Sequence, residues 1–341
     1  MYSFKNDYSE GAHPKILQAM MSSNEEQTEG YGEDKYCNEA RSILKKLMKA
    51  EDVDIHFLMG GTQTNLTAIS AFLRPHEAVI SANTGHIFVH ETGAIEATGH
   101  KVITVDTEDG KLDIDKIERV LKEHTDEHMV KPKMVYISSP TEIGTIYNKK
   151  ELITIKEFCD ENDLILYMDG ARLGSGLSSD ENDLEFSDLP KLLDAFYIGG
   201  TKNGALLGEA LVISKNELKK DFRFHIKQKG GLMAKGRILG IQFLELFKDG
   251  LYLEIGKHEN DMAKRLKEGL ESLECRFFIE SSTNQIFPIL ANDLIEELNE
   301  KYSFYIWQEI DSSYSAIRLV TSWATKEENV EAFIKDIKNW K

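Results

Sequence analysis

Short apolar runs alternate with helical patterns along residues 1–249, and this alternation limits the possible folds more than any other feature. Several runs are apolar throughout instead of at every second residue, which is typical of strands covered on both faces. Strands that alternate with helices predict an α/β fold with a mainly parallel sheet. The seven predicted strands are residues 55–59, 78–81, 101–105, 133–138, 164–168, 195–198 and 210–214. The clearest helical patterns are residues 38–48, 64–72, 113–124 and 149–162.

The pattern changes after residue 249. A long helical pattern over residues 251–273 is followed by short predicted strands at residues 276–279, 285–290, 304–308 and 317–321. Thr325 and Glu328 have the spacing of a capping box, which predicts a last helix that ends near Trp340. A chain of 341 residues is long for one small core. We therefore expect a large domain over residues 1–249 and a smaller α+β domain over residues 250–341.

The formal net charge of −17 argues against nucleic acid or an anionic membrane as a partner, since both attract basic surfaces. Three widely spaced cysteines without a CxxC pair indicate reduced thiols rather than a disulfide framework. The first residues lack an apolar signal core, and no apolar run reaches the length of a membrane span. We expect a cytoplasmic protein.

Two of the apolar strands end in short motifs that suit the same cofactor. Lys202 lies in a glycine-rich turn after residues 195–198, and Asp169 follows residues 164–168. Pyridoxal phosphate needs an amine for a Schiff base and an anion that keeps its ring nitrogen protonated. Taken separately, the lysine is typical of a solvated turn and the aspartate of a helix N-cap. Together, at the ends of two buried strands of one α/β chain, they favour a site.

The turn that follows the first predicted strand contains Gly60, Gly61 and Thr62 directly before a helical pattern. Free amides at a helix N-terminus attract an anion, and glycines let the anion approach the backbone closely. The chain has neither the GxGxxG fingerprint nor a Walker loop at this turn. A cofactor with one phosphate is therefore favoured over a dinucleotide. A plain strand-to-helix turn is the alternative.

His86 and His90 lie four residues apart in a segment with several polar residues. An imidazole can stack on a planar cofactor and can also move protons. The pair has the spacing of metal ligands on a helix, but no third ligand follows at a zinc-like distance, so we expect no metal. Histidines on the surface or in the core are the alternative.

Two arginines are candidates for binding an anionic substrate. Arg172 comes three residues after Asp169 and could reach the substrate carboxylate or the cofactor with a bidentate fork. Arg318 stands inside an apolar strand, where an unpaired charge is costly, so a substrate carboxylate is a plausible counter-ion. A structural salt bridge is the alternative for Arg318.

The motifs, in this order, resemble those of the threonine aldolase family, and the resemblance covers nearly the whole chain. That family belongs to the β-eliminating lyase group of fold-type-I pyridoxal-phosphate enzymes. The resemblance therefore implies an aminotransferase-like large domain and a smaller C-terminal domain. The matching segments are residues 31–34, 60–65, 86–88 with Glu91, 169–172, 201–202 and 318–321.

The resemblance implies roles for the residues at the matching positions. Lys202 would carry the cofactor, Asp169 would hold its ring nitrogen, and His86 would stack on its ring. The phosphate would be bound by Gly61 and Thr62, with help from Thr201.

The resemblance also implies how the substrate is bound. Arg172 and Arg318 would grip its carboxylate, and Asn6 falls near that carboxylate, where relatives often have serine. In the family, Tyr31 reaches across a subunit interface. The implied partners are thus an amino-acid substrate and further copies of the chain, as a homodimer or homotetramer with shared sites.

The chain departs from the family pattern at two positions. Many members have a histidine that contacts the substrate hydroxyl where this chain has Glu142. The base is therefore open between Glu142, His86 and a bound water. Relatives often have an arginine that contacts the phosphate from the neighbouring subunit at the position of Ala234, and Lys235 or Lys229 could replace it.

The resemblance implies cleavage of the Cα–Cβ bond of L-threonine, L-allo-threonine or a related β-hydroxy-α-amino acid, which yields glycine and an aldehyde. The same cofactor supports β-elimination or racemisation, and these reactions stay open as alternatives. A protein that binds pyridoxal phosphate without turnover is a remote alternative, because Lys202 and Asp169 are both present. A nicotinamide oxidoreductase is disfavoured because the dinucleotide fingerprint is absent.

Overall fold

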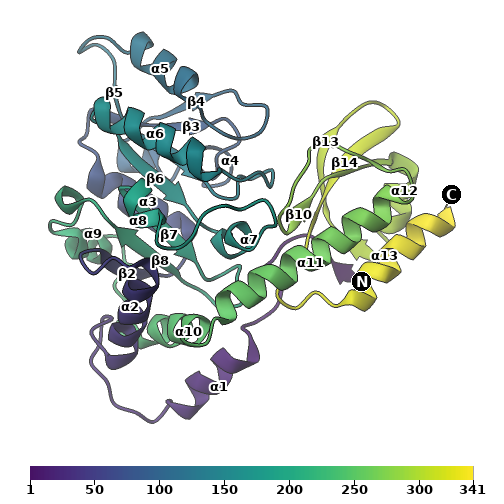
Figure 1. Cartoon of the computed structure of the whole chain (residues 1–341), viewed down its shortest axis with the longest axis horizontal. Helices are drawn as coiled ribbons and strands as arrows, with labels where there is room; N and C mark the ends of the chain where they lie inside the picture. The colour runs from purple at the N-terminus through teal and green to yellow at the C-terminus, as the bar shows by residue number, and fades with distance from the viewer. Residues whose placement is uncertain (341) are drawn as a thin grey trace.

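The computed structural model describes residues 1–340, and a seven-stranded sheet forms the centre of its larger part (Figure 1). In spatial order the strands are β2 (Asp54–Leu58), β8 (Glu209–Ile213), β7 (Ala195–Gly199), β6 (Ile165–Asp169), β5 (Lys131–Ser138), β3 (Glu77–Ala82) and β4 (Val102–Val105). Neighbours from β7 to β4 are parallel, and β8 is antiparallel to both β7 and β2. The predicted mainly parallel seven-stranded sheet is confirmed.

The helices of this part follow the strands in the expected alternation. They are α1 (Pro14–Ser22), α2 (Lys35–Met48), α3 (Gly61–Phe72), α4 (His86–Val89), α5 (Ile114–Glu123), α6 (Lys149–Glu161), α7 (Leu173–Leu177), α8 (Leu189–Leu192), α9 (Phe222–Gln228) and α10 (Arg237–Lys248). The four predicted helical patterns appear as α2, α3, α5 and α6. The sequence pattern does not predict α1, α9, α10 or the short helices α4, α7 and α8.

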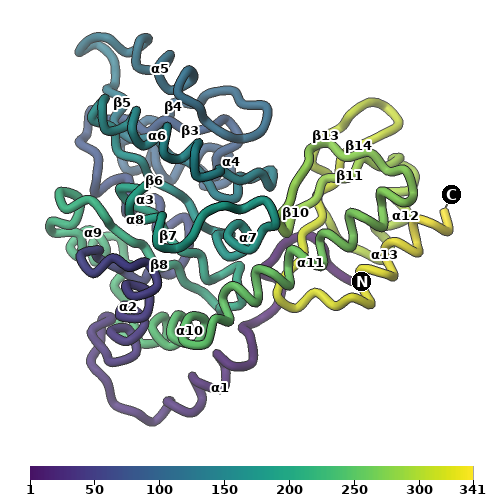
Figure 2. The backbone as a smooth tube through the Cα atoms, viewed as in Figure 1, coloured from purple at the N-terminus to yellow at the C-terminus, as the bar shows by residue number. Residues whose placement is uncertain are grey.

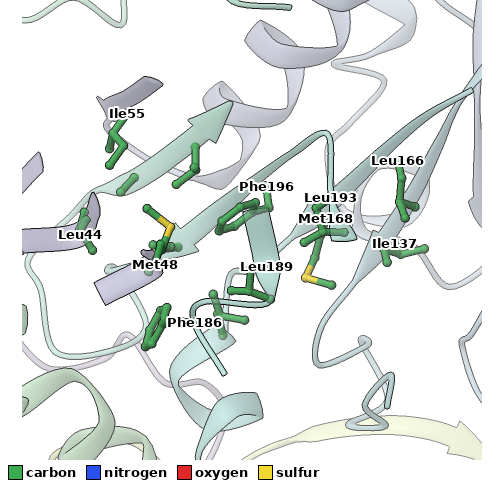
Figure 3. Close-up of a cluster of buried hydrophobic side chains, with 14 of the residues drawn as sticks. Leu44, Met48, Ile55, Ile137, Leu166, Met168, Phe186, Leu189, Leu193 and Phe196 are labelled. Atoms are coloured by element: carbon green, nitrogen blue, oxygen red, sulfur yellow. The ribbon is translucent and has the colours of Figure 1, made fainter. Parts of the chain in front are cut away.

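The sheet is covered on both faces, which explains why several of its strands are apolar throughout. Successive strand residues point to opposite faces, so Ile137 and Leu166 join one hydrophobic cluster while Tyr136 and Tyr167 join the other. Figure 3 shows part of the first cluster, in which Leu44, Met48 and Ile55 lie at one end and Ile137, Leu166 and Met168 at the other. The second cluster lies against α3 and α9.

The C-terminal part begins with the long helix α11 (Leu251–Glu271), which runs from beside α10 to the far side of the molecule (Figures 1 and 2). Its antiparallel sheet has the order β10 (Gln285–Ile286), β14 (Tyr314–Val320), β11 (Pro288–Ala291) and β9 (Arg276–Phe277), with β13 (Tyr305–Glu309) also paired to β14. The helices α12 (Asn292–Leu298) and α13 (Glu327–Trp340) complete it. This confirms a smaller antiparallel α+β part, and the boundary at residue 249 stays a prediction.

The N-terminal segment joins the two parts of the molecule. Strand β1 (Tyr2–Ser3) pairs in parallel with β12 (Tyr302–Ser303), and Phe4 is buried in the core of the C-terminal part. The chain then crosses to the larger part, where α1 extends along its lower edge in the view of Figure 2. No helix within residues 1–340 combines the length and apolar character needed to cross a bilayer.

Candidate active site

Two adjoining cavities lie at the carboxyl ends of β5, β6 and β7, which is where ligands bind in open α/β sheets. The inner cavity has a volume of about 270 Å³ and the outer cavity, which opens toward the C-terminal sheet, about 580 Å³. Both are lined by His86, Glu142, Arg172 and Lys202. The inner cavity is also lined by Gly61, Thr62, Asp169, Tyr197, Thr201 and Glu209, and the outer one by His90, Tyr305, Trp307 and Arg318.

Close packing of two turns brings Lys202 to Asp169. Strands β6 and β7 are parallel neighbours, so the turns that follow them start side by side. A Cβ atom added to Gly199 would lie 2.3 Å from the carbonyl oxygen of Ala171, and one added to Gly170 would lie 2.0 Å from that of Tyr197. Glycine is therefore required at both positions. Without it, the two turns could not approach this closely.

The cavity environment lowers the pKa of the Lys202 amine. Desolvation is the largest cause, and the charge of Arg172 acts in the same direction. The carboxylates of Asp7, Asp169 and Glu209 oppose this shift without cancelling it. A lysine that loses its proton more easily is a better nucleophile toward a carbonyl carbon.

The carboxylate of Asp169 is buried and accepts four hydrogen bonds. Its Oδ1 accepts from the hydroxyl of Tyr197 and, at 3.0 Å, from the amide of Ala171. Its Oδ2 accepts from the hydroxyl of Tyr136 at 2.6 Å and from Nδ2 of Asn65 at 3.0 Å. Burial raises the pKa of Asp169, but the charge of a nearby imidazole and these hydrogen bonds outweigh burial and lower it overall. The site thus keeps a buried negative charge.

The same network fixes the ring of His86. Nδ2 of Asn65 also donates to Oε1 of Glu91, at 2.8 Å. That oxygen lies 2.8 Å from Nδ1 of His86, and the side chain of Glu91 is fully buried. A carboxylate accepts hydrogen bonds, so Nδ1 carries the proton. The imidazole therefore faces the cavities in one orientation.

The N-terminus of α3 provides a cradle for an anion. Its first amide that donates within the helix belongs to Thr64, which bonds to the carbonyl of Gly60. The amides of Gly61 and Thr62 precede it and so have no partner in the helix, and both residues line the inner cavity. The predicted phosphate contacts Gly61 and Thr62 therefore lie together. Thr201 lines the same cavity.

Glu142 lies where the two cavities meet. Its Oε1 accepts from Oγ of Ser138 at 2.8 Å and from the amide of His86 at 2.9 Å. Burial, followed by the charge of Asp169, raises the pKa of Glu142 above its ordinary value. A carboxyl group with a raised pKa next to an amine and an imidazole is suited to proton transfer.

The two arginines differ in their partners. Arg172 makes a two-pronged contact with Asp7, from Nε to Oδ2 at 2.6 Å and from its terminal nitrogen to Oδ1 at 3.2 Å. Arg318 stacks on Tyr305 and Trp307, with its guanidinium carbon 5.1 Å and 5.4 Å from the ring centres. Within residues 1–340, the buried Nε of Arg318 has no hydrogen-bond partner. Burial and the charge of Arg172 lower the pKa of Arg318 to about 10.

Two predicted site residues lie outside the cavity walls. The amide oxygen of Asn6 accepts from the backbone of Tyr8 at 3.0 Å and from Oγ of Ser9 at 2.9 Å, so it stabilises a local turn. Tyr31 lies near the N-terminus of α10, is 45% exposed, and has the Lys227 amine 4.7 Å from its ring centre. Their roles stay predictions, and that of Tyr31 requires a second copy of the chain.

Several residues of the site were not predicted to have a role. No sequence motif distinguishes Tyr136 and Tyr197 from ordinary strand residues. A hydroxyl in a fully buried strand needs a hydrogen-bond partner, however, and this requirement is a signal that could have identified them. Asp7 lies one residue after Asn6 and holds Arg172 from 165 positions away, so no local pattern reveals it. Glu209 is a further case, since it begins an otherwise apolar strand.

The residues fit pyridoxal phosphate. A lysine amine reaches the inner cavity, a buried carboxylate lies beside it, and the amide cradle of α3 can take one phosphate. The unpartnered Nε of Arg318 fits the carboxylate of an amino acid.

Comparisons with known proteins agree with this assignment. The model of the β-eliminating lyase family matches residues 5–293. The low-specificity L-threonine aldolase of Pseudomonas sp. is 32% identical, over 98% of this chain and 96% of its own length. The structure of Leishmania major threonine aldolase superposes with a TM-score of 0.99 at 51% identity, covering 100% of this chain and 99% of that one. A histidinol-phosphate aminotransferase from Clostridium acetobutylicum, at 16% identity, shares the fold with a TM-score of 0.76 over 100% of this chain and 99% of its own.

The extent of these matches confirms the family predicted from the motifs, together with its fold type and its use of pyridoxal phosphate. The chain therefore belongs to the β-eliminating lyase family.

Proposed function

We propose that this protein is a pyridoxal-phosphate-dependent lyase that cleaves the Cα–Cβ bond of L-threonine, L-allo-threonine or a related β-hydroxy-α-amino acid. The products are glycine and an aldehyde. The relatives named threonine aldolase support this substrate class. The observation that carries the proposal is the position of Glu142, a carboxyl group with a raised pKa in the walls that also hold Lys202.

The chemistry that pyridoxal phosphate supplies when bound is an electron sink for the pair released from the Cα–Cβ bond. Lys202 provides the amine that holds the cofactor, and its lowered pKa keeps more of that amine in the neutral, reactive form. Asp169 provides the negative charge that stabilises a protonated ring nitrogen. The four donors around Asp169 keep that charge in place during turnover.

Arg318 is the residue best placed to orient the substrate. Arg172 already has a carboxylate partner in Asp7, whereas Nε of Arg318 lacks one among residues 1–340. A bidentate contact to the substrate carboxylate would satisfy this nitrogen and fix the direction of the amino acid in the cavity. The rings of Tyr305 and Trp307 hold the guanidinium in position for this contact.

Glu142 takes the proton from the substrate hydroxyl. Its Oε1 is already bonded to Ser138 and to the amide of His86, which leaves Oε2 to accept the proton. As the proton leaves, the C–O bond becomes the carbonyl of the aldehyde and the Cα–Cβ pair is released. A proton returned to Cα then completes glycine.

A substrate panel tests the reaction type. Purified protein is incubated with L-threonine, L-allo-threonine, phenylserine, L-cysteine and L-alanine, and aldehyde, ammonia, pyruvate and the D-isomer are measured together. We expect aldehyde and glycine in equal amounts from the hydroxy amino acids. Ammonia with pyruvate, or a D-isomer, as the main product would instead establish β-elimination or racemisation. Borohydride reduction should fix the cofactor to Lys202, and its recovery on any other lysine would overturn that assignment.

We also propose that the chain works as a homodimer or homotetramer in which Tyr31 of one copy completes the site of another. The exposure of Tyr31 and of two large apolar residues on α1 supports this. Leu17 is 46% exposed and Met21 is 82% exposed in the single chain. Such residues on a projecting helix favour burial against another protein surface.

A further inference from the structure

Glu209 is a buried acid in the inner cavity that the reaction described above does not use. It begins β8, where its backbone pairs with Leu58 of β2 and Gly199 of β7. Only 4% of the residue is exposed. It lines the cavity together with the phosphate cradle at Gly61 and Thr62. A carboxylate so close to an anion site calls for an explanation, since like charges repel.

Hydrogen bonds connect Glu209 to the residue predicted to help bind the phosphate. Its Oε2 accepts from the amide of Gly200 at 3.0 Å, and its Oε1 lies 2.8 Å from Oγ1 of Thr201. Oγ1 of Thr201 also accepts from the amide of Gly208, at 3.0 Å. While Glu209 is ionised, the hydroxyl proton of Thr201 is directed to Glu209 and is not available to an anion in the cavity.

Protonation of Glu209 reverses this hydrogen bond. The acid proton on Oε1 then donates to Oγ1 of Thr201, whose two lone pairs accept from Glu209 and from Gly208. The hydroxyl proton of Thr201 is left to point into the cavity. The Gly200 amide still bonds to Oε2, so the turn need not move.

We propose that Glu209 is a positioning residue that, when protonated, turns the Thr201 hydroxyl toward the cradle and so strengthens binding of the cofactor's phosphate. Binding of the phosphate is then coupled to uptake of one proton. This inference rests on pyridoxal phosphate as the cofactor and does not depend on the reaction that follows.

The electrostatics of the cavity place this switch in an accessible pH range. Burial is the main cause that raises the pKa of Glu209 to about 8, while the hydrogen bonds from Thr201 and Gly200 and the charge of Lys202 oppose it. The titratable groups that face Glu209 are Lys202, Asp169, Tyr167, Tyr197 and Tyr252. A phosphate in the cradle adds negative charge and favours the protonated form further.

The sign of the pH effect follows from this coupling. Because the cofactor binds better to the protonated form, its affinity falls as the pH rises through the pKa of Glu209. Loss of one hydrogen bond to a charged group weakens binding by about tenfold or more between about pH 7 and pH 9. Pyridoxal, which has no phosphate, should lack this component.

The test measures dissociation constants of pyridoxal phosphate and of pyridoxal for the apoprotein across this pH range, from the quenching of tryptophan fluorescence. The ratio of the two constants isolates the contribution of the phosphate. In the wild type this ratio should change about tenfold toward alkaline pH. In Glu209→Gln it should stay constant, because the amide is neutral at every pH and its Nε2 can still donate to Thr201.

Two variants of Thr201 provide an independent check that leaves Glu209 in place. Thr201→Ser keeps the hydroxyl and should keep the pH dependence of the ratio, whereas Thr201→Val should remove it. Folding of each variant is verified by circular dichroism. A ratio with unchanged pH dependence in Glu209→Gln or in Thr201→Val would overturn the proposal. If Glu209→Gln weakened the binding of pyridoxal phosphate and of pyridoxal by the same factor at every pH, the role of Glu209 would be purely structural. That result would also overturn the proposal.

Discussion

At the scale of single residues, four donors maintain the charge on Asp169, and the proposed reaction depends on that charge. Asp169→Asn should still bind pyridoxal phosphate, since the cradle and Lys202 are unchanged. Turnover should fall by about 10²-fold or more, because a neutral amide no longer stabilises a protonated ring nitrogen. Absorbance of the bound cofactor and kcat for the best substrate measure the two effects separately. Near-wild-type turnover would contradict the role given to Asp169.

Tyr136→Phe is the matched control for that variant. It removes one hydrogen bond to Oδ2 of Asp169 and leaves the carboxylate. A hydrogen bond to a charged group contributes about 1.5 kcal/mol or more, so we expect a loss of about tenfold, smaller than that in Asp169→Asn. A larger loss than in Asp169→Asn would mean that the phenol itself acts in turnover.

Glu142 is the proposed base for the substrate hydroxyl. A base must be ionised, so kcat/KM should rise with pH through the raised pKa of Glu142. Glu142→Gln should remove this rise and slow cleavage by about 10²-fold or more, with cofactor absorbance unchanged. An unchanged rate across pH would pass the role to His86 or a bound water.

Ser138→Ala is a control that keeps the Glu142 carboxyl group and changes only its pKa. The Ser138 hydroxyl bonds to Oε1 of Glu142 and thereby lowers its pKa. Removing this hydroxyl should shift the rise of kcat/KM to higher pH while the plateau rate stays close to that of the wild type. A shift to lower pH would contradict the assignment of that rise to Glu142.

The site residues that could be predicted from the sequence are those whose chemistry is visible locally. Lys202 and Asp169 stand out because each ends an apolar strand next to glycines. Asp7 could not be found in this way, since its partner Arg172 is distant in sequence. The predicted contact of Thr201 with the phosphate is more complex than expected, because its hydroxyl already bonds to Glu209.

At the scale of elements, the predictions are correct where burial produces a recognisable apolar pattern in the sequence. Several strands of the central sheet are continuous apolar runs, and the sequence predicts all seven within a few residues of their bounds. Helix α10 was missed because its residues from Leu239 to Phe247 are all buried, so no polar face marks a helical period. Helix α3 begins at Gly61, earlier than residue 64, because Gly60 serves as its N-cap without a side-chain signal.

The hairpin of β13 and β14 gives a prediction at this scale. Trp307 on β13 stacks on Arg318 of β14 above the outer cavity. Trp307→Ala should raise KM for threonine by about three- to tenfold with a smaller change in kcat, since cation–π contacts contribute about 1 kcal/mol or more when partly desolvated. Gln308→Ala, an exposed position on the same strand, is the control and should leave both constants unchanged. A fall in kcat without a change in KM would contradict a role in substrate binding.

At the scale of the whole molecule, Asp7 connects the two parts. Its carboxylate bonds to Arg172 of the larger part and to Asn284 of the C-terminal part. Burial raises the pKa of Asp7, but the charges of Arg172 and Lys202 and these hydrogen bonds lower it overall. A carboxyl whose pKa is lowered in the folded state stabilises the protein above its unfolded pKa of about 3.9, and that stabilisation is lost as the pH falls through the folded pKa.

Asp7→Asn should therefore lower the free energy of unfolding at neutral pH by about 3 kcal/mol, because it leaves the largely buried Arg172 without a counter-charge. The difference from the wild type should shrink as the pH falls below about 4. Denaturant titrations at several pH values measure this difference. Glu10→Gln, an exposed carboxylate of the same segment, is the control and should have little effect. A constant difference across the acid range would contradict the linkage.

The proposed sharing of sites between copies predicts that two inactive variants restore activity when they are mixed. Lys202→Ala and Tyr31→Ala should each be nearly inactive alone. In a mixed dimer with shared sites, one of the two sites contains both native residues. About half of the randomly reassembled dimers are mixed, so the mixture should reach about a quarter of wild-type activity. A mixture of Lys202→Ala and Asp169→Asn is the control. These two residues line one cavity of a single chain, so every site in the mixed dimer lacks one of them and activity should not return. Differently tagged chains verify that mixed oligomers form. If they form and activity does not return, Tyr31 acts within its own chain or not at all.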